Sequence, residues 1–194
     1  LVEGRSHPQF PETRKLLFSD PKTFSRLLAR LARVAGDLLV CQARAGVDAV
    51  QLFDTGGGLL GGADFETFSL EPLRGIIRRL RRECPGLPII LYVNNGAHLL
   101  ARLRTAGADV VSVDWRTPLS EARRRLGRGI AVQGNLDPYA LFLPLPRLRE
   151  RVREVLRDNG GRAGHIFNLG HGVLPGTPVE AVKCLVETVH EYRA

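Results

Sequence analysis

A short motif that joins the end of a helix to the start of a strand occurs twice in this chain. The stretch Ala45-Gly-Val-Asp-Ala-Val50 is echoed by Ala106-Gly-Ala-Asp-Val-Val111, and in both copies glycine stands where a helix C-terminus favours it. Gly160-Gly161 takes a similar position before the last apolar run. This repetition indicates helices that alternate with strands. Such a chain builds either a doubly wound open sheet or a closed (β/α)8 barrel.

Five apolar runs and six periodic segments supply the predicted elements. Short runs rich in Val and Ile, without strict alternation, are typical of strands buried on both faces of a parallel sheet. Between them, apolar residues recur at helical spacing, as in the segment from Leu27 to Leu38. We predict strands at 49–53, 89–93, 110–113, 130–133 and 166–169, and helices near 21–45, 70–83, 96–106, 118–126, 145–158 and 178–192.

Polar residues follow each predicted strand, and in a βα barrel the loops after the strands form the active site. The most informative strand end is the last one, where an apolar run stops at His171 between Gly170 and Gly172. Small neighbours let a ligand approach the backbone, and the imidazole is a titratable ring. The candidate rim consists of Asp54, Thr55, Asn94, Asn95, Asp114, Arg116, Gln133, Asn135, Asp137, Asn168 and His171. Asn and Asp also satisfy loop backbone groups, which is an alternative role for Asp54, Asn135 and Asp137.

Four of these strand ends, taken together, resemble the uroporphyrinogen decarboxylase family. They read QLFDTGGG at 51–58, VDWR at 113–116, VQGNLDP at 132–138 and NLGHGVLPGTP at 168–178. The segment Leu1-Val-Glu-Gly4 is similar to the one after the middle strands of the family. The resemblance covers essentially the whole chain and implies a (β/α)8 TIM-type barrel. This chain would supply about the last five β/α units of it, as a single-domain fragment over residues 1–194.

The first three strands of that barrel would come from sequence absent here. The chain contains no methionine and begins Leu1-Val2-Glu3, which we interpret as a fragment of a longer protein. Five strands without their neighbours would leave two open sheet edges. We therefore expect this piece to be stable only within the intact protein.

The resemblance implies a function. The family is a cofactor-independent carboxy-lyase that removes the four acetate carboxyl groups of uroporphyrinogen and forms coproporphyrinogen in porphyrin and heme biosynthesis. Thr55 matches a substrate-binding hydroxyl position, and His171 matches a histidine that contacts a substrate carboxylate. The resemblance also implies that the full-length protein is a homodimer. Its arginine-rich loop, catalytic aspartate and substrate-binding tyrosine would lie in the absent part, so we name no catalytic residue and expect no activity from this piece alone. The resemblance assigns no role to Asp54, Asp114 or Arg116.

Composition narrows the alternatives. The formal net charge of +8 comes from arginine, because only Lys15, Lys22 and Lys183 are lysines. The runs at 78–82 and 123–125 lie within predicted helices and lack interleaved aromatic residues, which favours solvated helix faces over nucleic-acid binding. No stretch approaches the roughly 20 apolar residues of a membrane-spanning helix.

The cysteines are Cys41, Cys84 and Cys184, which are odd in number, far apart and without a histidine at metal-ligand spacing. They predict no disulfide framework and no metal site, and they fit a reducing cytoplasm.

Three rival functions remain open. A corrinoid-linked methyltransferase has a similar architecture and binds zinc through histidine and cysteine, but the corresponding strand end reads Tyr92-Val-Asn-Asn-Gly96. A non-catalytic module that holds tetrapyrroles or an acidic partner is the second rival, and an arginine-rich nucleic-acid binder is the third.

Overall fold

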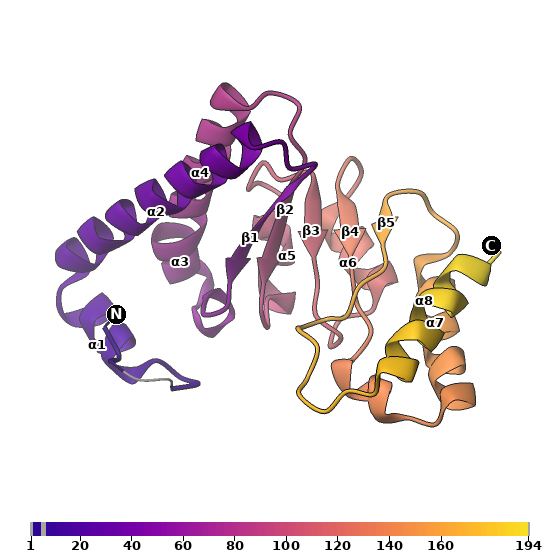
Figure 1. The fold of residues 1–194 in the computed structure, drawn as a ribbon. Helices are drawn as coiled ribbons and strands as arrows, with labels where there is room; N and C mark the ends of the chain where they lie inside the picture. The colour runs from indigo at the N-terminus through magenta and orange to yellow at the C-terminus, as the bar shows by residue number, and fades with distance from the viewer. Residues whose placement is uncertain (1, 5–6, 194) are drawn as a thin grey trace.

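Five parallel strands form a single sheet in the computed structural model, which describes residues 2–4 and 7–193 (Figure 1). The strands are β1 (Val50–Asp54), β2 (Ile89–Val93), β3 (Val110–Ser112), β4 (Ala131–Gln133) and β5 (His165–Ile166). They lie side by side in chain order, and every neighbouring pair is parallel. A doubly wound sheet reverses its strand order at a switch point, so the sequential order excludes that alternative for these five strands.

The predicted strands are confirmed, with one correction at the last of them. The strand expected at 166–169 is present as β5 at His165–Ile166, because the neighbouring chain leaves regular strand geometry at Gly134, whose φ of 131° only glycine adopts readily. Hydrogen bonding between the two segments continues past this point. Leu136 donates to the carbonyl oxygen of Asn168 at 3.1 Å, and Gly170 donates to the carbonyl oxygen of Leu136 at 2.7 Å. The chain therefore stays extended as far as the segment that carries His171.

Helices fill the connections between the strands. The α-helices are α1 (Pro11–Ser19), α2 (Pro21–Arg44), α3 (Gly62–Phe65), α4 (Glu71–Glu83), α5 (Leu100–Leu103), α6 (Leu119–Leu126), α7 (Leu145–Asn159) and α8 (Val179–Glu191). Short 3₁₀ turns η1 (Gly57–Leu59), η3 (Ala97–Leu99) and η4 (Pro138–Phe142) and a π turn, η2 (Glu66–Leu70), complete the set.

Two helix predictions need correction. The helix expected over 96–106 consists only of η3 and α5, because the hydroxyl of Thr105 donates to the carbonyl oxygen of Arg102 at 2.7 Å and ends the helix early. Helix α1 was not predicted, since its sequence buries a single apolar residue, Leu17. Its first turn is held from outside, where the carboxylate of Glu3 accepts a 2.7 Å hydrogen bond from the backbone N–H of Thr13.

The helices cover one face of the sheet. Alternate strand residues point toward them, and Leu52, Leu91, Val111 and Val132 are buried there in the larger apolar core. Figure 1 shows α5 and α6 behind the strands, with α2 and α4 on one flank and α7 and α8 on the other. A second core forms where α7, α8 and η4 meet. The opposite face of the sheet is uncovered, and Phe53 on it is 68% exposed.

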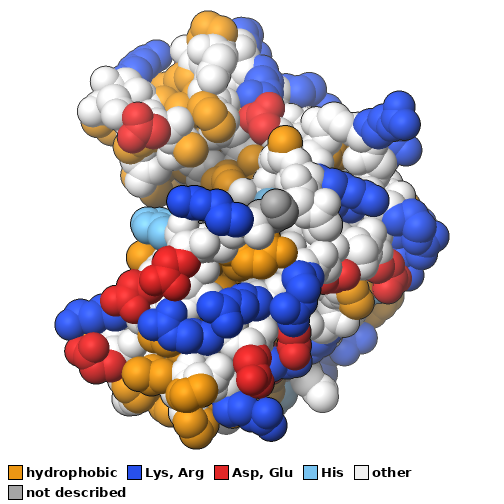
Figure 2. All heavy atoms as spheres, turned by 90° about the vertical axis from the view of Figure 1, so that its right-hand side faces the viewer, with side chains coloured by type: hydrophobic (Ala, Val, Ile, Leu, Met, Phe, Trp, Pro, Cys, Tyr) orange, Lys and Arg blue, Asp and Glu red, His pale blue; other side chains and the backbone are white. Residues whose placement is uncertain are grey.

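Charged side chains of both signs are interspersed on the outer helices, as Figure 2 shows for the flank that α7 and α8 occupy. Arg149 of α7 reaches Glu187 of α8 at 3.2 Å, and within α7 Arg151 pairs with Glu154 at 2.5 Å. Such pairing is typical of solvated helix surfaces. Within residues 2–4 and 7–193, no helix has both the length and the apolar character that crossing a membrane requires.

Candidate active site

A cavity of about 310 Å³ opens on the uncovered face, at the carboxyl ends of the strands. It brings together three residues of the predicted rim that are far apart in the sequence, Thr55, Asn168 and His171. The loops after β1 and β5 supply these three, so the strand-end reasoning located this wall correctly. The full lining is Gln51, Phe53, Thr55, Tyr92, Ser112, Asn168, Leu169, Gly170, His171, Gly172 and Val173.

Thr55 has a free hydroxyl because its neighbour caps the loop. The carboxylate of Asp54 accepts hydrogen bonds from the backbone N–H groups of Gly56 at 3.2 Å and Gly57 at 2.7 Å, and it also accepts one from the hydroxyl of Ser69. Asp54 points toward the helices and Thr55 toward the cavity, as alternation along a strand requires. The exposed Thr55 hydroxyl forms no hydrogen bond with any described residue. The loop-capping role therefore belongs to Asp54.

The His171 ring is oriented by its own backbone. The N–H of Gly172 donates to Nδ1 of His171 at 2.8 Å, so in the neutral ring the proton resides on Nε2. His171 is exposed, and Nε2 makes no hydrogen bond within the described part of the chain. It is thus a donor directed at solvent or ligand, and protonation of the ring would add a positive charge at the same place.

Tyr92 lies beneath the histidine, and the sequence analysis did not identify it. Its phenol donates to the carbonyl oxygen of Gly170 at 2.9 Å and also lies 3.2 Å from the Asn94 side-chain oxygen. The ring packs edge-on against His171 and against Phe53, with centroid distances of 6.3 Å and 6.1 Å. Burial, reinforced by the charge of Asp114, raises the pKa of the Tyr92 phenol to about 12. The group is therefore a neutral donor at physiological pH.

A polar network forms the floor of the cavity. The amide nitrogen of Gln133 donates to Gln51 at 3.2 Å and to the hydroxyl of Ser112 at 3.1 Å. These side chains belong to β4, β1 and β3, and they share the uncovered face with Tyr92. Of these three, only Gln133 was predicted as a rim residue, because the strand-end rule points to residues at or after the carboxyl ends of strands and not to inward-facing residues earlier in them.

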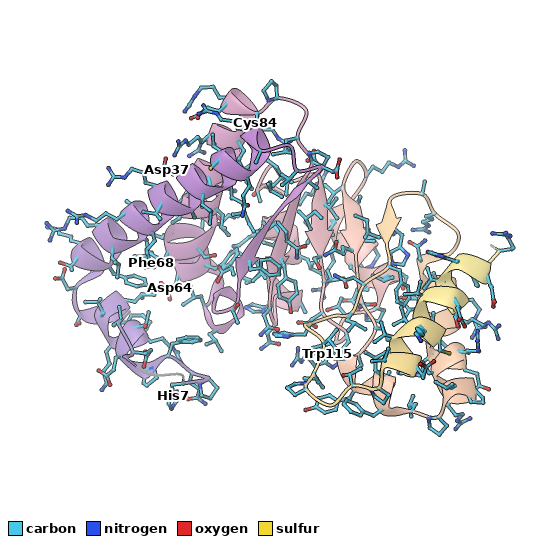
Figure 3. The ribbon with its side chains drawn as sticks, viewed as in Figure 1. His7, Asp37, Asp64, Phe68, Cys84 and Trp115 are labelled. Atoms are coloured by element: carbon cyan, nitrogen blue, oxygen red, sulfur yellow. The ribbon has the colours of Figure 1, made fainter. Side chains whose placement is uncertain are left out.

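Asp114 and Arg116 form a separate brace at the rim. Asp114 is buried and accepts hydrogen bonds from the backbone N–H groups of Asn95 at 2.8 Å and Arg116 at 3.0 Å. Its carboxylate also lies 3.3 Å from the Arg116 guanidinium, which stacks over the Trp115 ring at 4.0 Å. Trp115 lies near the loop that follows β5 (Figure 3). None of the three lines the cavity, so the structure gives them a role in shaping the rim.

Two of the remaining predicted rim residues, Asn135 and Asp137, also hold loops in place. The side-chain amide of Asn135 donates to the carbonyl oxygens of Asp114 at 2.9 Å and Thr117 at 2.6 Å. Asp137 caps η4 by accepting a 2.9 Å hydrogen bond from Tyr139. The alternative reading of Asp54, Asn135 and Asp137 as loop-satisfying residues is therefore confirmed.

Gly170 is required by close packing rather than by its backbone angles. A Cβ at this position would lie 2.5 Å from the backbone nitrogen of Trp115 and 3.1 Å from the carbonyl carbon of Asp114. Gly172, on the other side of His171, has no atom within 4 Å of the corresponding point. The two glycines that flank the histidine thus serve different purposes.

Comparison with known proteins identifies the family. The sequence model described as uroporphyrinogen decarboxylase (URO-D) matches residues 1–192. The chain belongs to the uroporphyrinogen decarboxylase family. Uroporphyrinogen decarboxylase from Hahella chejuensis is 43% identical over 196 residues, and that from Sorangium cellulosum is 45% identical over 190 residues. The matches cover 100% and 98% of this chain but 55% and 54% of those relatives, so the chain spans about half of their length.

A solved structure supports the fold independently. A methyltransferase from Methanosarcina mazei superimposes with a TM-score of 0.76 at 22% identity, over 95% of this chain and 54% of that one. At this level of identity the likeness concerns the fold alone. Among the described residues, no group of three or more His, Cys, Asp or Glu side chains is arranged to hold a metal ion.

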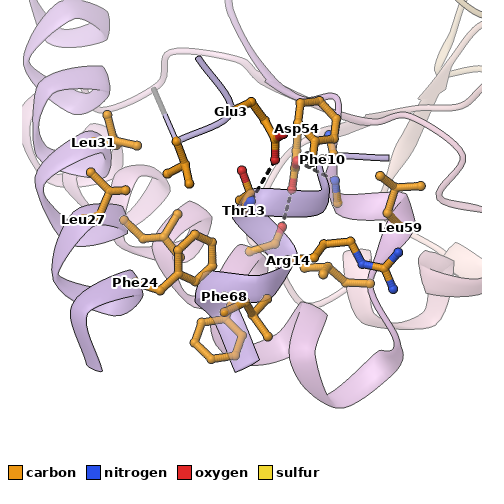
Figure 4. Close-up of a pocket in the computed structure, with 17 residues that line it drawn as sticks. Glu3, Phe10, Thr13, Arg14, Phe24, Leu27, Leu31, Asp54, Leu59 and Phe68 are labelled. Carbon is orange, nitrogen blue, oxygen red and sulfur yellow. Dashed lines mark hydrogen bonds between the residues drawn. The ribbon is translucent and has the colours of Figure 1, made fainter. Parts of the chain in front are cut away.

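The segment Leu1-Val-Glu-Gly4, which is similar to the family's segment after its middle strands, contributes Val2 and Glu3 to a second cavity. This cavity, of about 390 Å³, lies among α1, α2 and the loop after β1 (Figure 4). Val2 and Glu3 line it together with mostly apolar residues such as Leu27 and Phe68, while Leu1 lies outside the described residues. Asp54 reaches this second cavity and not the one that holds Thr55.

Proposed function

We propose that this chain is the carboxyl-terminal part of a uroporphyrinogen decarboxylase and that it forms one wall of the substrate site. The complete protein would convert uroporphyrinogen to coproporphyrinogen by removing four acetate carboxyl groups. The observation that carries the proposal is the single cavity shared by Thr55 and His171, in a chain that belongs to this family.

The chemistry of the wall suits a polycarboxylate. No acidic residue is among the described residues that line the cavity, whereas a free hydroxyl and a ring N–H open into it. A carboxylate accepts hydrogen bonds from both groups, and a protonated His171 would add a charge-assisted bond. Thr55 and His171 therefore act as substrate-binding residues.

The bond-breaking step needs a further group. Protonation of a pyrrole carbon creates a cation that accepts the electron pair released when CO2 leaves. An anion near the pyrrole nitrogens would stabilise that cation. The described residues of this wall supply no such anion, so residues from the rest of the protein would provide it. We infer that residues 1–194 alone do not decarboxylate uroporphyrinogen.

The complete protein would close the sheet into a (β/α)8 barrel, with three further strands between the exposed edges of β1 and β5. Both edges are free within the described residues, and the matched relatives are nearly twice as long as this chain. We further propose a cytoplasmic homodimer that uses no cofactor.

The experiment compares the chain alone with the chain joined to the amino-terminal part of the Hahella chejuensis relative. Each is incubated with uroporphyrinogen, and chromatography of the oxidised porphyrins counts the carboxyl groups that remain. We expect unchanged uroporphyrinogen from residues 1–194 and coproporphyrinogen from the joined protein. In the joined protein, His171→Ala should lower kcat/KM about 10- to 100-fold, the value of a lost charge-assisted hydrogen bond.

His190→Ala serves as the matched control, because His190 is an exposed histidine on α8 that does not line the cavity. Equal losses from the two substitutions would contradict the proposed role of His171. Binding by the joined protein without any CO2 loss would identify a non-catalytic tetrapyrrole-binding module instead.

A further inference from the structure

An arginine-lined hollow lies at the amino ends of β4 and β5, at the opposite end of the strands from His171. Its volume is about 780 Å³, and Ala131 at the start of β4 forms part of its wall. Four arginines line it, Arg123 and Arg124 from α6, Arg128 from the turn that follows, and Arg162 from the loop before β5. The rest of the lining is Gly127, Gly129, Ile130, Ala131, Ala163 and Gly164.

Several arginines elsewhere in the chain have carboxylate partners, whereas these four have none among the described residues. On α4, Arg79 pairs with Asp37 at 2.7 Å, and on α7 Arg147 pairs with Glu150 at 3.4 Å. No carboxylate of the described residues lies within ion-pair distance of any of the four arginines, and no acidic side chain of the described chain lines the hollow. The positive charge there is uncompensated.

Uncharged hydrogen-bond acceptors hold Arg123, the most enclosed of the four arginines, in place. Nε of Arg123 donates to the side-chain oxygen of Asn159 at 2.8 Å, and Nη2 donates to the carbonyl oxygens of Ala163 at 3.1 Å and Gly164 at 2.9 Å. The planar guanidinium is therefore held in one orientation without being neutralised. Burial and then the charge of Arg162 lower the pKa of the Arg123 guanidinium, so the protein tolerates repulsion between the two.

A fifth cation lies beside the hollow. The guanidinium carbon of Arg104 is 3.2 Å from the point where a Cβ on Gly127 would stand. The side chains of Arg124, Arg128 and Arg162 are exposed and line the same hollow, so they can converge on a ligand there. Guanidinium groups bind phosphate and carboxylate groups through two parallel hydrogen bonds, which suits a ligand with several such groups.

We propose that this hollow binds a multivalent oxyanion at a site distinct from the cavity of His171. Occupancy would neutralise the converging arginines and stabilise the amino-terminal end of the sheet, where side chains in barrels of this kind serve stability rather than catalysis. Phosphate and carboxylate groups share the chemistry that the site recognises. The hollow lacks aromatic side chains among the described residues, which favours a small polyanion over a nucleic-acid strand.

The test uses isothermal titration calorimetry on the protein as its host produces it, at low ionic strength. Inorganic tripolyphosphate is the first probe, citrate the second and a short single-stranded RNA the third. We expect saturable binding of tripolyphosphate or citrate, and the tighter of the two identifies the oxyanion class. The double variant Arg128→Ala/Arg162→Ala removes two exposed side chains and should weaken that binding at least tenfold.

The control double variant, Arg147→Ala/Arg151→Ala, also removes two exposed arginines, from α7. It lowers the net charge equally and should leave the dissociation constant within about twofold. Equal weakening in both variants would show a general charge effect and overturn the site. Unchanged binding in the first variant, or tighter binding of the RNA than of either small probe, would overturn it as well. None of these outcomes depends on decarboxylase activity.

Discussion

The phenol of Tyr92 donates a hydrogen bond to the carbonyl oxygen of Gly170 at 2.9 Å, so the centre of the sheet fixes the residue that precedes His171. Tyr92 is in β2 and Gly170 follows β5, and two strands separate them in the sheet. This bond connects the strand-end loop of the site to a buried group.

Removal of that hydroxyl should destabilise the protein measurably. Tyr92→Phe leaves the buried carbonyl oxygen of Gly170 without this donor, and we expect the free energy of unfolding to fall by about 1–3 kcal/mol. Urea unfolding, followed by fluorescence of the single tryptophan, Trp115, measures it. Tyr139→Phe is the control, because Tyr139 is 68% exposed and should change stability by less than about 0.5 kcal/mol. Equal stabilities of the two variants would contradict the role of the bond.

Ionisation of Tyr92 provides an alkaline test. Its folded pKa of about 12 lies above the ordinary value of 10.0, so the unfolded chain loses the proton first as the pH rises. Stability from this group is therefore complete below pH 10 and is lost between about pH 10 and 12. Tyrosinate absorbance of the wild type minus that of Tyr92→Phe should show a midpoint near 12. A midpoint near 10 would show that the phenol is not buried.

At acid pH, protonation of His165 should lower the stability of the folded protein. Burial lowers its pKa below the ordinary 6.5, and the charge of Arg123 acts in the same direction, against a hydrogen bond to the carbonyl oxygen of Gly134. The unfolded chain takes up the proton first as the pH falls. The stability contributed by neutral His165 is thus present above pH 6.5 and is lost as the pH falls from 6.5 through the folded pKa. An NMR titration of the His165 ring should give a midpoint below 6.5, and a midpoint above it would refute the assignment.

The two glycines that flank His171 should respond differently to the same change. Gly170→Ala places a methyl group 2.5 Å from the Trp115 backbone nitrogen, which must shift, and we expect a loss of about 1–3 kcal/mol in unfolding free energy. Gly172→Ala meets nothing within 4 Å and should be close to neutral. Thermal unfolding of both variants measures the difference. Equal melting temperatures would mean that the loop is not packed against Trp115 in solution.

The hydroxyl of Thr55 should matter for ligand binding and little for stability. It forms no hydrogen bond within the described chain, so Thr55→Val should leave unfolding free energy within about 0.5 kcal/mol of the wild type. Affinity for the proposed substrate, uroporphyrinogen, should fall about 5- to 10-fold through one lost hydrogen bond. Thr67→Val on the exposed surface of η2 is the control. A large stability loss with unchanged affinity would assign Thr55 to the loop.

Patterns close together in the sequence predicted most of the sheet, because buried parallel strands require apolar runs and the helices between them require periodic ones. The candidate rim followed from one rule, since loops after parallel strands meet at one edge, and the resemblance to the family then singled out Thr55 and His171 within it. Tyr92 could not be found in this way. An aromatic residue within a strand has the composition of core, and only the sheet register shows that it shares a face with Ser112 and Gln133.

The two missed or shortened elements depend on distant or local polar contacts. Helix α1 is anchored by Glu3, which no periodicity within the helix reveals. The early end of α5 depends on the hydroxyl of Thr105, whose competition with the helix is visible only in the folded chain. In both cases one hydrogen bond outweighs a weak local preference.

Asp54 and Thr55 are adjacent, yet one supports the loop from the helix side and the other opens into the cavity. An insertion or deletion of a single residue within β1 would exchange their directions. A carboxylate would then enter the pocket and repel any acidic molecule, while the glycine loop would lose its cap. The length of this strand is therefore constrained more tightly than the identity of its apolar residues.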